Sequence, residues 1–303
     1  MELFSYSLKW LELIMRWSHV LFAILWVGNS FLFNYLDNKL EKNIKTKKVS
    51  AEGFLMHSGY FYKLSRLKGA PDQFPRELIF FKWQSYLTFI TGIFLLIIIY
   101  YANAEILMID KRINDISPST AILISILFLI GSWILYDLLC RSPLINHQKI
   151  FILTIFIFIV IIAFTLTKIF GSKFAFLSLG VIMGSNMFAN VFTVIIPNQK
   201  NLVNSALKKQ KLDKSLSTKA KIRSIHNNYA TFLVLFIMLS GHWAFIWAHE
   251  YNWIILAAIA LITASVRHYF NLRGKKKNNI YLLSFSILSI ILLILILFYN
   301  KTM

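Results

Sequence analysis

The stretch KIFILTIFIFIVIIAFTLTK, residues 149–168, carries charged side chains only at its two ends. As a helix rising 1.5 Å per residue it is about 30 Å long, the thickness of the hydrocarbon core of a bilayer. Backbone amides in that core must bond within the protein, so a spanning segment of this kind is helical. Comparable stretches recur along the chain and predict an all-α, polytopic membrane protein with about eight transmembrane helices. The expected spans are 11–36, 83–103, 118–139, 149–168, 174–196, 227–248, 252–270 and 280–299.

The segments between these spans alternate in charge. If the first connection is cytoplasmic, all but seven of the 32 Lys and Arg residues fall on the cytoplasmic side. This asymmetry follows the positive-inside rule and predicts a multi-pass protein of the bacterial inner membrane with both termini in the periplasm. We expect one transmembrane domain over residues 1–303, with long cytoplasmic loops at 37–82 and 197–226.

The net charge of +19 needs no nucleic-acid partner. The basic residues flank membrane spans, where topology and contact with anionic membrane lipid account for them, and no nucleic-acid recognition module is visible. The single cysteine, Cys140, excludes an internal disulfide. The sequence also contains no C-x-x-C-H motif, so we expect no covalently attached haem c in this chain.

The two long loops differ in composition. The first begins Lys-rich, which predicts solvated helix or coil, and then becomes aromatic in GFLMHSGYFYKLSRL, residues 53–67. That aromatic part is too short to span, so we expect it at the membrane interface or between helices. The second loop is mostly Lys, Asn, Ser and Gln and is typical of a solvated connector.

Two histidines near the outer ends of their spans suggest a cofactor. His19 and His242 each lie about two turns inside the membrane, roughly 10 Å deep at 1.5 Å per residue. Facing imidazoles at matched depth could ligate a b-type haem, and Arg16 could pair with a propionate. The alternative is that each histidine only hydrogen-bonds within the bundle and that Arg16 extends to the interface.

A second polar group lies towards the cytoplasm and suits an anionic, planar ligand. His226, Asn227 and Asn228 begin the sixth span, where the positive end of the helix dipole attracts an anion. Asn186 and Asn190 are four residues apart and share one helix face. Amides can bond the edge of a heterocycle while aromatic rings stack on its face. The alternative interpretation is a capped helix start with polar packing and an interfacial aromatic belt.

Three long pieces of the sequence carry a family resemblance. They are RWSHVLFAILWVGNSFLFNYLDNKL (16–40), EGFLMHSGYFYKLSRLKGAPDQFPRELIFFKWQSYLTFITGIFLLIIIYY (52–101) and SIHNNYATFLVLFIMLSGHW (224–243). In these pieces the chain resembles the cytochrome-c-linked urate hydroxylases, also called the urate oxidase N-terminal family, and the resemblance extends over nearly the whole chain.

The resemblance implies oxidation of urate to 5-hydroxyisourate, with water supplying the oxygen and cytochrome c taking the electrons. On this chain we predict His57 and His226 as catalytic residues, with His57 as the general base. We predict that His19 and His242 ligate a haem b beside Arg16. The residues predicted to bind urate or a related purine are Lys63, Lys82, Trp83, Asn186, Asn190, Asn227 and Asn228.

The sequence departs from the family pattern in two places. Members typically continue into a cytochrome c domain, whereas this sequence ends at Met303, so we expect a separate periplasmic cytochrome c as partner. Gln84 stands where relatives often have glutamate, which argues against a carboxylate base there. The alternative functions are a haem-binding electron conduit without catalysis, and a channel or carrier for purines.

Overall fold

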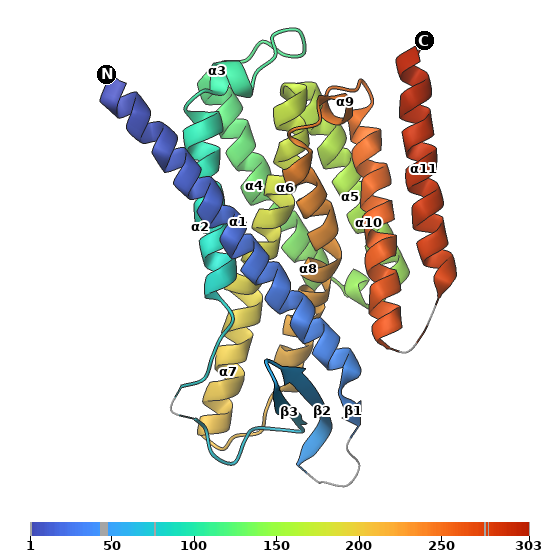
Figure 1. Ribbon diagram of the computed structural model, residues 1–303. Helices are drawn as coiled ribbons and strands as arrows, with labels where there is room; N and C mark the ends of the chain where they lie inside the picture. Colours follow the sequence, from blue (N-terminus) through green and yellow to red (C-terminus); the bar gives the residue numbers. More distant parts are fainter. Residues whose placement is uncertain (1, 43–47, 76, 276, 278, 303) are drawn as a thin grey trace.

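The computed structural model describes residues 2–42, 48–75, 77–275, 277 and 279–302, and these form a bundle of long helices (Figure 1). The long helices are α1 (Glu2–Lys39), α2 (Trp83–Leu95), α4 (Pro118–Arg141), α5 (Gln148–Ile169), α6 (Ser172–Ala189), α7 (Ile196–Leu207), α8 (Lys214–Ser240), α10 (Asn252–Gly274) and α11 (Ile280–Thr302). Short helical turns are α3 (Ala104–Leu107), α9 (Ala244–Trp247) and η2 (Pro143–Asn146). Two π-helical turns are η1 (Leu96–Tyr101), which continues α2, and η3 (Asn190–Ile195), which joins α6 to α7.

The predicted fold class is confirmed, because seven helical segments of the described chain are long and apolar enough to cross a membrane. The sixth predicted span, 227–248, is not among them. Its helix, α8, begins at Lys214 and ends at Ser240, so its first half carries Lys, Arg and Asn side chains. The Asp213 side chain accepts a hydrogen bond from the Ser215 N–H at 2.8 Å and thereby fixes this early start.

The second predicted loop, 197–226, is mostly helical. Helix α7 continues from η3 as far as Leu207, and Pro197 is its second residue, directly after the π-helical turn. Only residues 208–213 connect α7 to α8. Hydrogen bonds from the Ser215 backbone N–H and then its hydroxyl hold the pKa of the Asp213 carboxyl below its usual value, which favours the charged cap.

Part of the first predicted loop folds into a sheet. Helix or coil was expected only for its Lys-rich start, and residues 41–42 and 49–50 of that stretch are strand instead; residues 43–47 lie outside the described residues. Strands β1 (Glu41–Lys42), β2 (Val49–His57) and β3 (Tyr60–Leu67) form an antiparallel sheet in that order. Ser58 and Gly59 make the two-residue turn, both with positive φ. Phe54, Met56 and Phe61 share one exposed face, and Phe61 is 77% exposed. In the sequence, the Ser58–Gly59 pair between two aromatic stretches was the signal for a turn and hence for this hairpin.

Helix α6 lies at the centre of the bundle and packs against α2, α4, α5, α8 and α10. Phe174, Leu179 and Ile237 are buried in this core. A Cβ atom added to Gly180 would lie 2.6 Å from Cγ2 of Ile237, so the glycine permits the close approach of α6 and α8.

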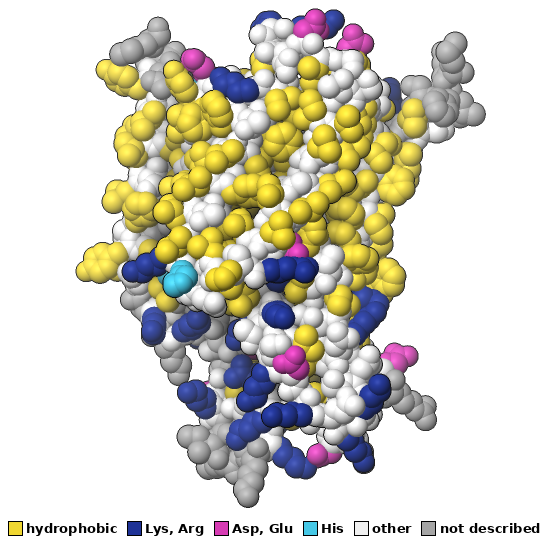
Figure 2. Space-filling view, turned by 180° about the vertical axis from the view of Figure 1, so that it is seen from behind, with side chains coloured by type: hydrophobic (Ala, Val, Ile, Leu, Met, Phe, Trp, Pro, Cys, Tyr) yellow, Lys and Arg dark blue, Asp and Glu magenta, His cyan; other side chains and the backbone are white. Residues whose placement is uncertain are grey.

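The surface divides into an apolar belt and a basic end. Figure 2 shows hydrophobic side chains over most of the visible face of the bundle, with Lys and Arg gathered at the end that carries α7 and the sheet. Helix α1 begins and α11 ends at the opposite end (Figure 1). This distribution is the charge asymmetry that the sequence predicts for a polytopic protein.

Candidate functional site

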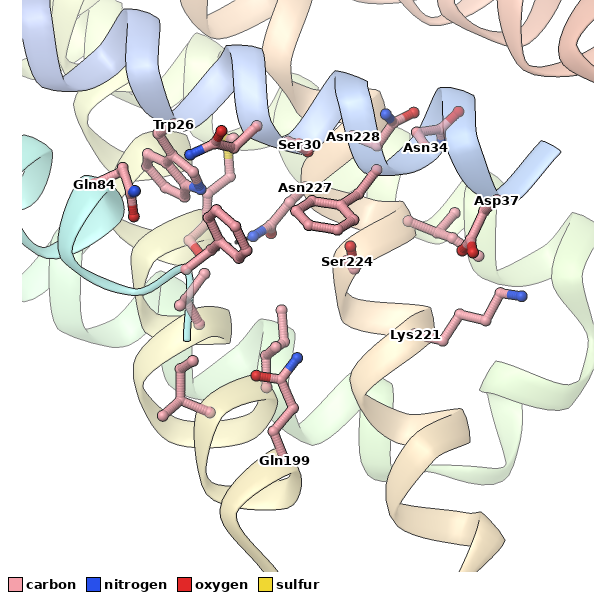
Figure 3. A pocket seen from close by; sticks show the side chains of 18 of the residues that line it. Trp26, Ser30, Asn34, Asp37, Gln84, Gln199, Lys221, Ser224, Asn227 and Asn228 are labelled. Carbon is pink, nitrogen blue, oxygen red and sulfur yellow. Dashed lines mark hydrogen bonds between the residues drawn. The ribbon is translucent and has the colours of Figure 1, made fainter. Parts of the chain in front are cut away.

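A cavity of about 750 Å³ opens at the basic end of the bundle. It lies between α1, residues 78–84, the η3–α7 segment, α8 and α10 (Figure 3). Its volume is within the range of small-molecule sites. We call it the amide cavity after the side-chain amides in its wall. These are Asn29, Asn34, Asn38, Gln84, Gln199, Asn227, Asn228 and Asn271.

Two charged groups of the wall lie at the end of the amide cavity opposite Trp26. Trp26 and Gln84 lie at one end, and Asp37 and Lys221 lie at the other (Figure 3). The buried Oε1 atom of Gln84 has no hydrogen-bond partner. Rings and unbonded amides suit a planar ligand that carries N–H and C=O groups.

A buried ion pair lies behind the cavity wall. Asp137 on α4 accepts a hydrogen bond from Nη2 of Arg223 on α8, and Nε of Arg141 lies 2.6 Å from the same carboxylate. Only 6% of the Arg223 side chain is exposed, compared with 71% for Arg141. Arg223 therefore depends on Asp137 for charge compensation, whereas Arg141 also contacts solvent.

Arg223 also fixes the orientation of two amides. Its Nη1 donates to Oδ1 of Asn190 at 3.1 Å, and Nδ2 of Asn190 donates to Oδ1 of Asn227 at 2.8 Å. Nδ2 of Asn227 then donates to the Met187 carbonyl at 2.9 Å. Because a guanidinium only donates, the orientation of each amide follows from the preceding one. The chain of bonds holds Asn227 rigidly in the cavity wall.

His226 faces away from the cavity. Nδ2 of Asn190 donates to the Tyr136 oxygen at 3.1 Å, so the Tyr136 hydroxyl is free to donate to Nδ1 of His226 at 2.8 Å. The imidazole accepts at Nδ1 and carries its proton on Nε2. Its ring stacks on Phe151 of α5 with 5.2 Å between centroids. His226, which was predicted to be catalytic, thus contacts α4 and α5. Hydrogen bonds through Tyr136, Asn190 and Asn227 connect it to the cavity wall.

The other predicted residues are dispersed. His57 and Lys63 lie on the exposed hairpin, where Lys63 pairs with Glu52 at 3.2 Å. Lys82 lies 5.4 Å from the centroid of the exposed Trp83 ring. Asn186 accepts a hydrogen bond from Ser132 at 3.3 Å. Of the predicted substrate-binding residues, Asn227 and Asn228 line the amide cavity, Asn190 supports it, and the rest lie outside its wall.

No substrate-binding side chain was predicted on α1, although Trp26 and Asp37 lie in the piece 16–40 that carries the family resemblance. Trp26, Ser30, Asn34 and Asp37 line the cavity from one face of this helix. Their spacing of three or four residues was the available signal, because polar side chains repeated along one face of an apolar helix indicate a polar neighbour. Asn271 on α10 was also missed.

The two histidines predicted to ligate haem have different surroundings. Nδ1 of His19 donates to the Thr88 carbonyl at 2.9 Å, which leaves the Nε2 lone pair available, as in metal-ligating histidines. His242 was expected inside the sixth span, two turns from its outer end; that placement is wrong, because α8 ends at Ser240 and His242 lies in the following turn with an exposed side chain. Arg16 pairs with Glu12 at 2.7 Å. Neither histidine lines the amide cavity, and the haem prediction stays a prediction.

The fold and the site define a polytopic helical membrane protein with a large amide-lined cavity at its basic end. The family model described as urate oxidase N-terminal matches residues 5–298. The chain therefore belongs to the urate oxidase N-terminal family. No curated protein matches the chain significantly, and no solved structure does.

Proposed function

We propose that this protein is a membrane-bound urate hydroxylase that binds urate in the amide cavity. Membership of the family supports a urate-related activity. The observation that carries the assignment to this site is the amide cavity itself, about 750 Å³ in volume and lined by amides and by Trp26. Urate is planar, is a monoanion near neutral pH, and carries N–H and C=O groups around both rings, which such a wall can bond and stack against.

The proposed reaction is a two-electron oxidation with water as the oxygen source. A bond forms between the water oxygen and C5 of urate as the C4=C5 double bond is lost, and 5-hydroxyisourate, two protons and two electrons result. Asp37 is the one carboxylate among the described residues of the cavity wall, and we assign it to accept a proton from water. Amides of the wall hold the substrate in place during this step.

We propose a separate periplasmic cytochrome c as the electron acceptor, with the protein in the bacterial inner membrane and both termini in the periplasm. The basic end of the bundle, which carries the cavity, supports a cytoplasmic site under the positive-inside rule. A haem b held by His19 and His242 would supply a one-electron carrier between the cavity and the acceptor. His19 bonds a backbone carbonyl through Nδ1, as metal-ligating histidines do. We assign no step of the reaction to the haem.

The proposal predicts urate-dependent reduction of cytochrome c by the purified protein. Two molecules of oxidised cytochrome c should be reduced for each urate consumed, with 5-hydroxyisourate as the product, because the reaction releases two electrons. The measurement follows cytochrome c absorbance and urate loss together, with heat-denatured protein as the control. Uptake of unaltered urate into proteoliposomes, with no reduction of cytochrome c, would instead identify a purine carrier and overturn the proposal.

A further inference from the structure

Three side chains on α8 and α10 form a hydrogen-bonded cluster at the wall of the amide cavity. Nε of Arg267 donates to Oδ1 of Asn228 at 2.7 Å, and Nδ2 of Asn271 donates to the same oxygen at 3.1 Å. Asn228 and Asn271 both line the cavity. Asn228 is 2% exposed, and its Nδ2 has no hydrogen-bond partner. Oδ1 of Asn271 is likewise buried without one.

The guanidinium determines which atoms of the two amides remain free. Arg267 can only donate, so the atom of Asn228 that faces it must be the oxygen. Asn271 therefore turns its nitrogen towards that oxygen and leaves its own oxygen free. The outcome is one free donor, Nδ2 of Asn228, and one free acceptor, Oδ1 of Asn271, on two side chains that are joined through the Asn228 oxygen. A buried donor and acceptor without partners are costly, and a ligand with a neighbouring C=O and N–H would satisfy both.

The charge of Arg267 favours an anion at this place. The residue is 6% exposed, and its guanidinium lies 4.0 Å from the centroid of the Phe31 ring. Among the described residues no carboxylate forms an ion pair with it. A buried cation without a counter-charge raises the local potential and polarises the Asn228 amide, so that its Nδ2–H becomes a stronger donor to an anionic ligand.

We propose that Asn228 and Asn271 recognise urate by bonding one adjacent C=O and N–H of its ring, and that Arg267 is the positioning residue for Asn228. This inference rests on the proposed function and assigns the specificity of that site. Nδ2 of Asn228 donates to a urate carbonyl oxygen, and Oδ1 of Asn271 accepts from the neighbouring ring N–H. The Arg267 guanidinium compensates the negative charge of the urate anion.

Equilibrium dialysis with labelled urate tests the proposal on the full chain in detergent. Asn228→Asp retains an acceptor for Arg267 but loses the donor and adds a charge of the same sign as urate, so Kd should rise by about tenfold or more. Asn271→Ala removes a neutral hydrogen bond, and Kd should rise by about 2- to 10-fold. The matched control is Asn198→Asp, because the Asn198 amide bonds the Leu216 carbonyl outside the cavity wall, and its Kd should stay at the wild-type value.

A series of N-methylated urates separates recognition from a structural role. The wild-type protein should reject the analogue that is methylated at the nitrogen facing Asn271, and Asn271→Ala should accept it because the oxygen is gone. Arg267→Lys retains a charged donor and should preserve this selectivity better than Arg267→Met. Wild-type Kd and wild-type selectivity in both Asn228→Asp and Asn271→Ala would overturn this inference alone. Failure of the wild-type protein to bind urate would overturn the proposed function as well.

Discussion

Asp137→Ala is expected to destabilise the folded protein by about 3–5 kcal/mol, because it leaves a buried guanidinium without its counter-charge. Arg223 is 6% exposed on its side chain and pairs with Asp137, which is itself 13% exposed. In the wild-type protein that carboxylate compensates the desolvation of the cation, and the variant leaves the charge buried without it. The midpoint and free energy of unfolding in detergent micelles, followed by helical circular dichroism, measure the loss.

Arg141→Ala provides the matched comparison, since it removes the other partner of the same carboxylate. The Arg141 side chain is 71% exposed, so its pairing with Asp137 should contribute less than about 1 kcal/mol. Equal destabilisation by Asp137→Ala and Arg141→Ala would contradict the expectation that Asp137 stabilises the fold mainly through its buried pair with Arg223. Because Arg223 also orients Asn190 and Asn227, Asp137→Ala should weaken urate binding in any protein that still folds.

Ser224→Trp should lower urate turnover by about 100-fold or more while leaving the fold intact. Ser224 lines the amide cavity from α8, between the Trp26 and Asp37 ends (Figure 3), and its side chain is small and not buried in the core. An indole at this position would occupy the space that urate needs and displace it from the catalytic geometry. Steady-state rates of cytochrome c reduction at saturating urate measure the effect.

Thr218→Trp introduces the same side chain on the same helix, away from the cavity. Thr218 is exposed, bonds only the Lys214 carbonyl of its own helix among the described contacts, and does not line the wall. The Thr218→Trp variant should retain close to wild-type urate turnover, because a substitution at an exposed position outside the cavity changes the stability of the fold little and leaves the urate site open. Wild-type turnover in Ser224→Trp would place the reaction outside the amide cavity.

The helices were predictable because apolar stretches of membrane length admit few other structures. The sheet of β1, β2 and β3 was missed, because its register is set by the Ser58–Gly59 turn, a two-residue signal that composition alone does not reveal. The start of the sixth span also differs from the prediction, because the Asp213 cap begins α8 well before the apolar residues.

The candidate site was predictable in part. Asn227 and Asn228 were found because they are polar residues on a bundle helix, where each polar group needs a partner. His226 is their neighbour in sequence but points towards α4 and α5. Asn190 begins the π-helical turn η3, whose extra residue shifts side-chain directions in a way that a 3.6-residue period does not describe. Residues of α1 and α10 complete the wall; the polar face of α1 was visible in its spacing, but the helices that it meets are set by tertiary packing.

The location of bound urate tests the central claim most directly. The measurement is a cryo-electron microscopy structure of the full chain in the presence of urate, compared with one in its absence. We predict a planar density in the amide cavity within hydrogen-bond distance of Asn228 and Asn271, present only with urate. Urate density beside His57 on the exposed hairpin, with none in the amide cavity, would contradict the account.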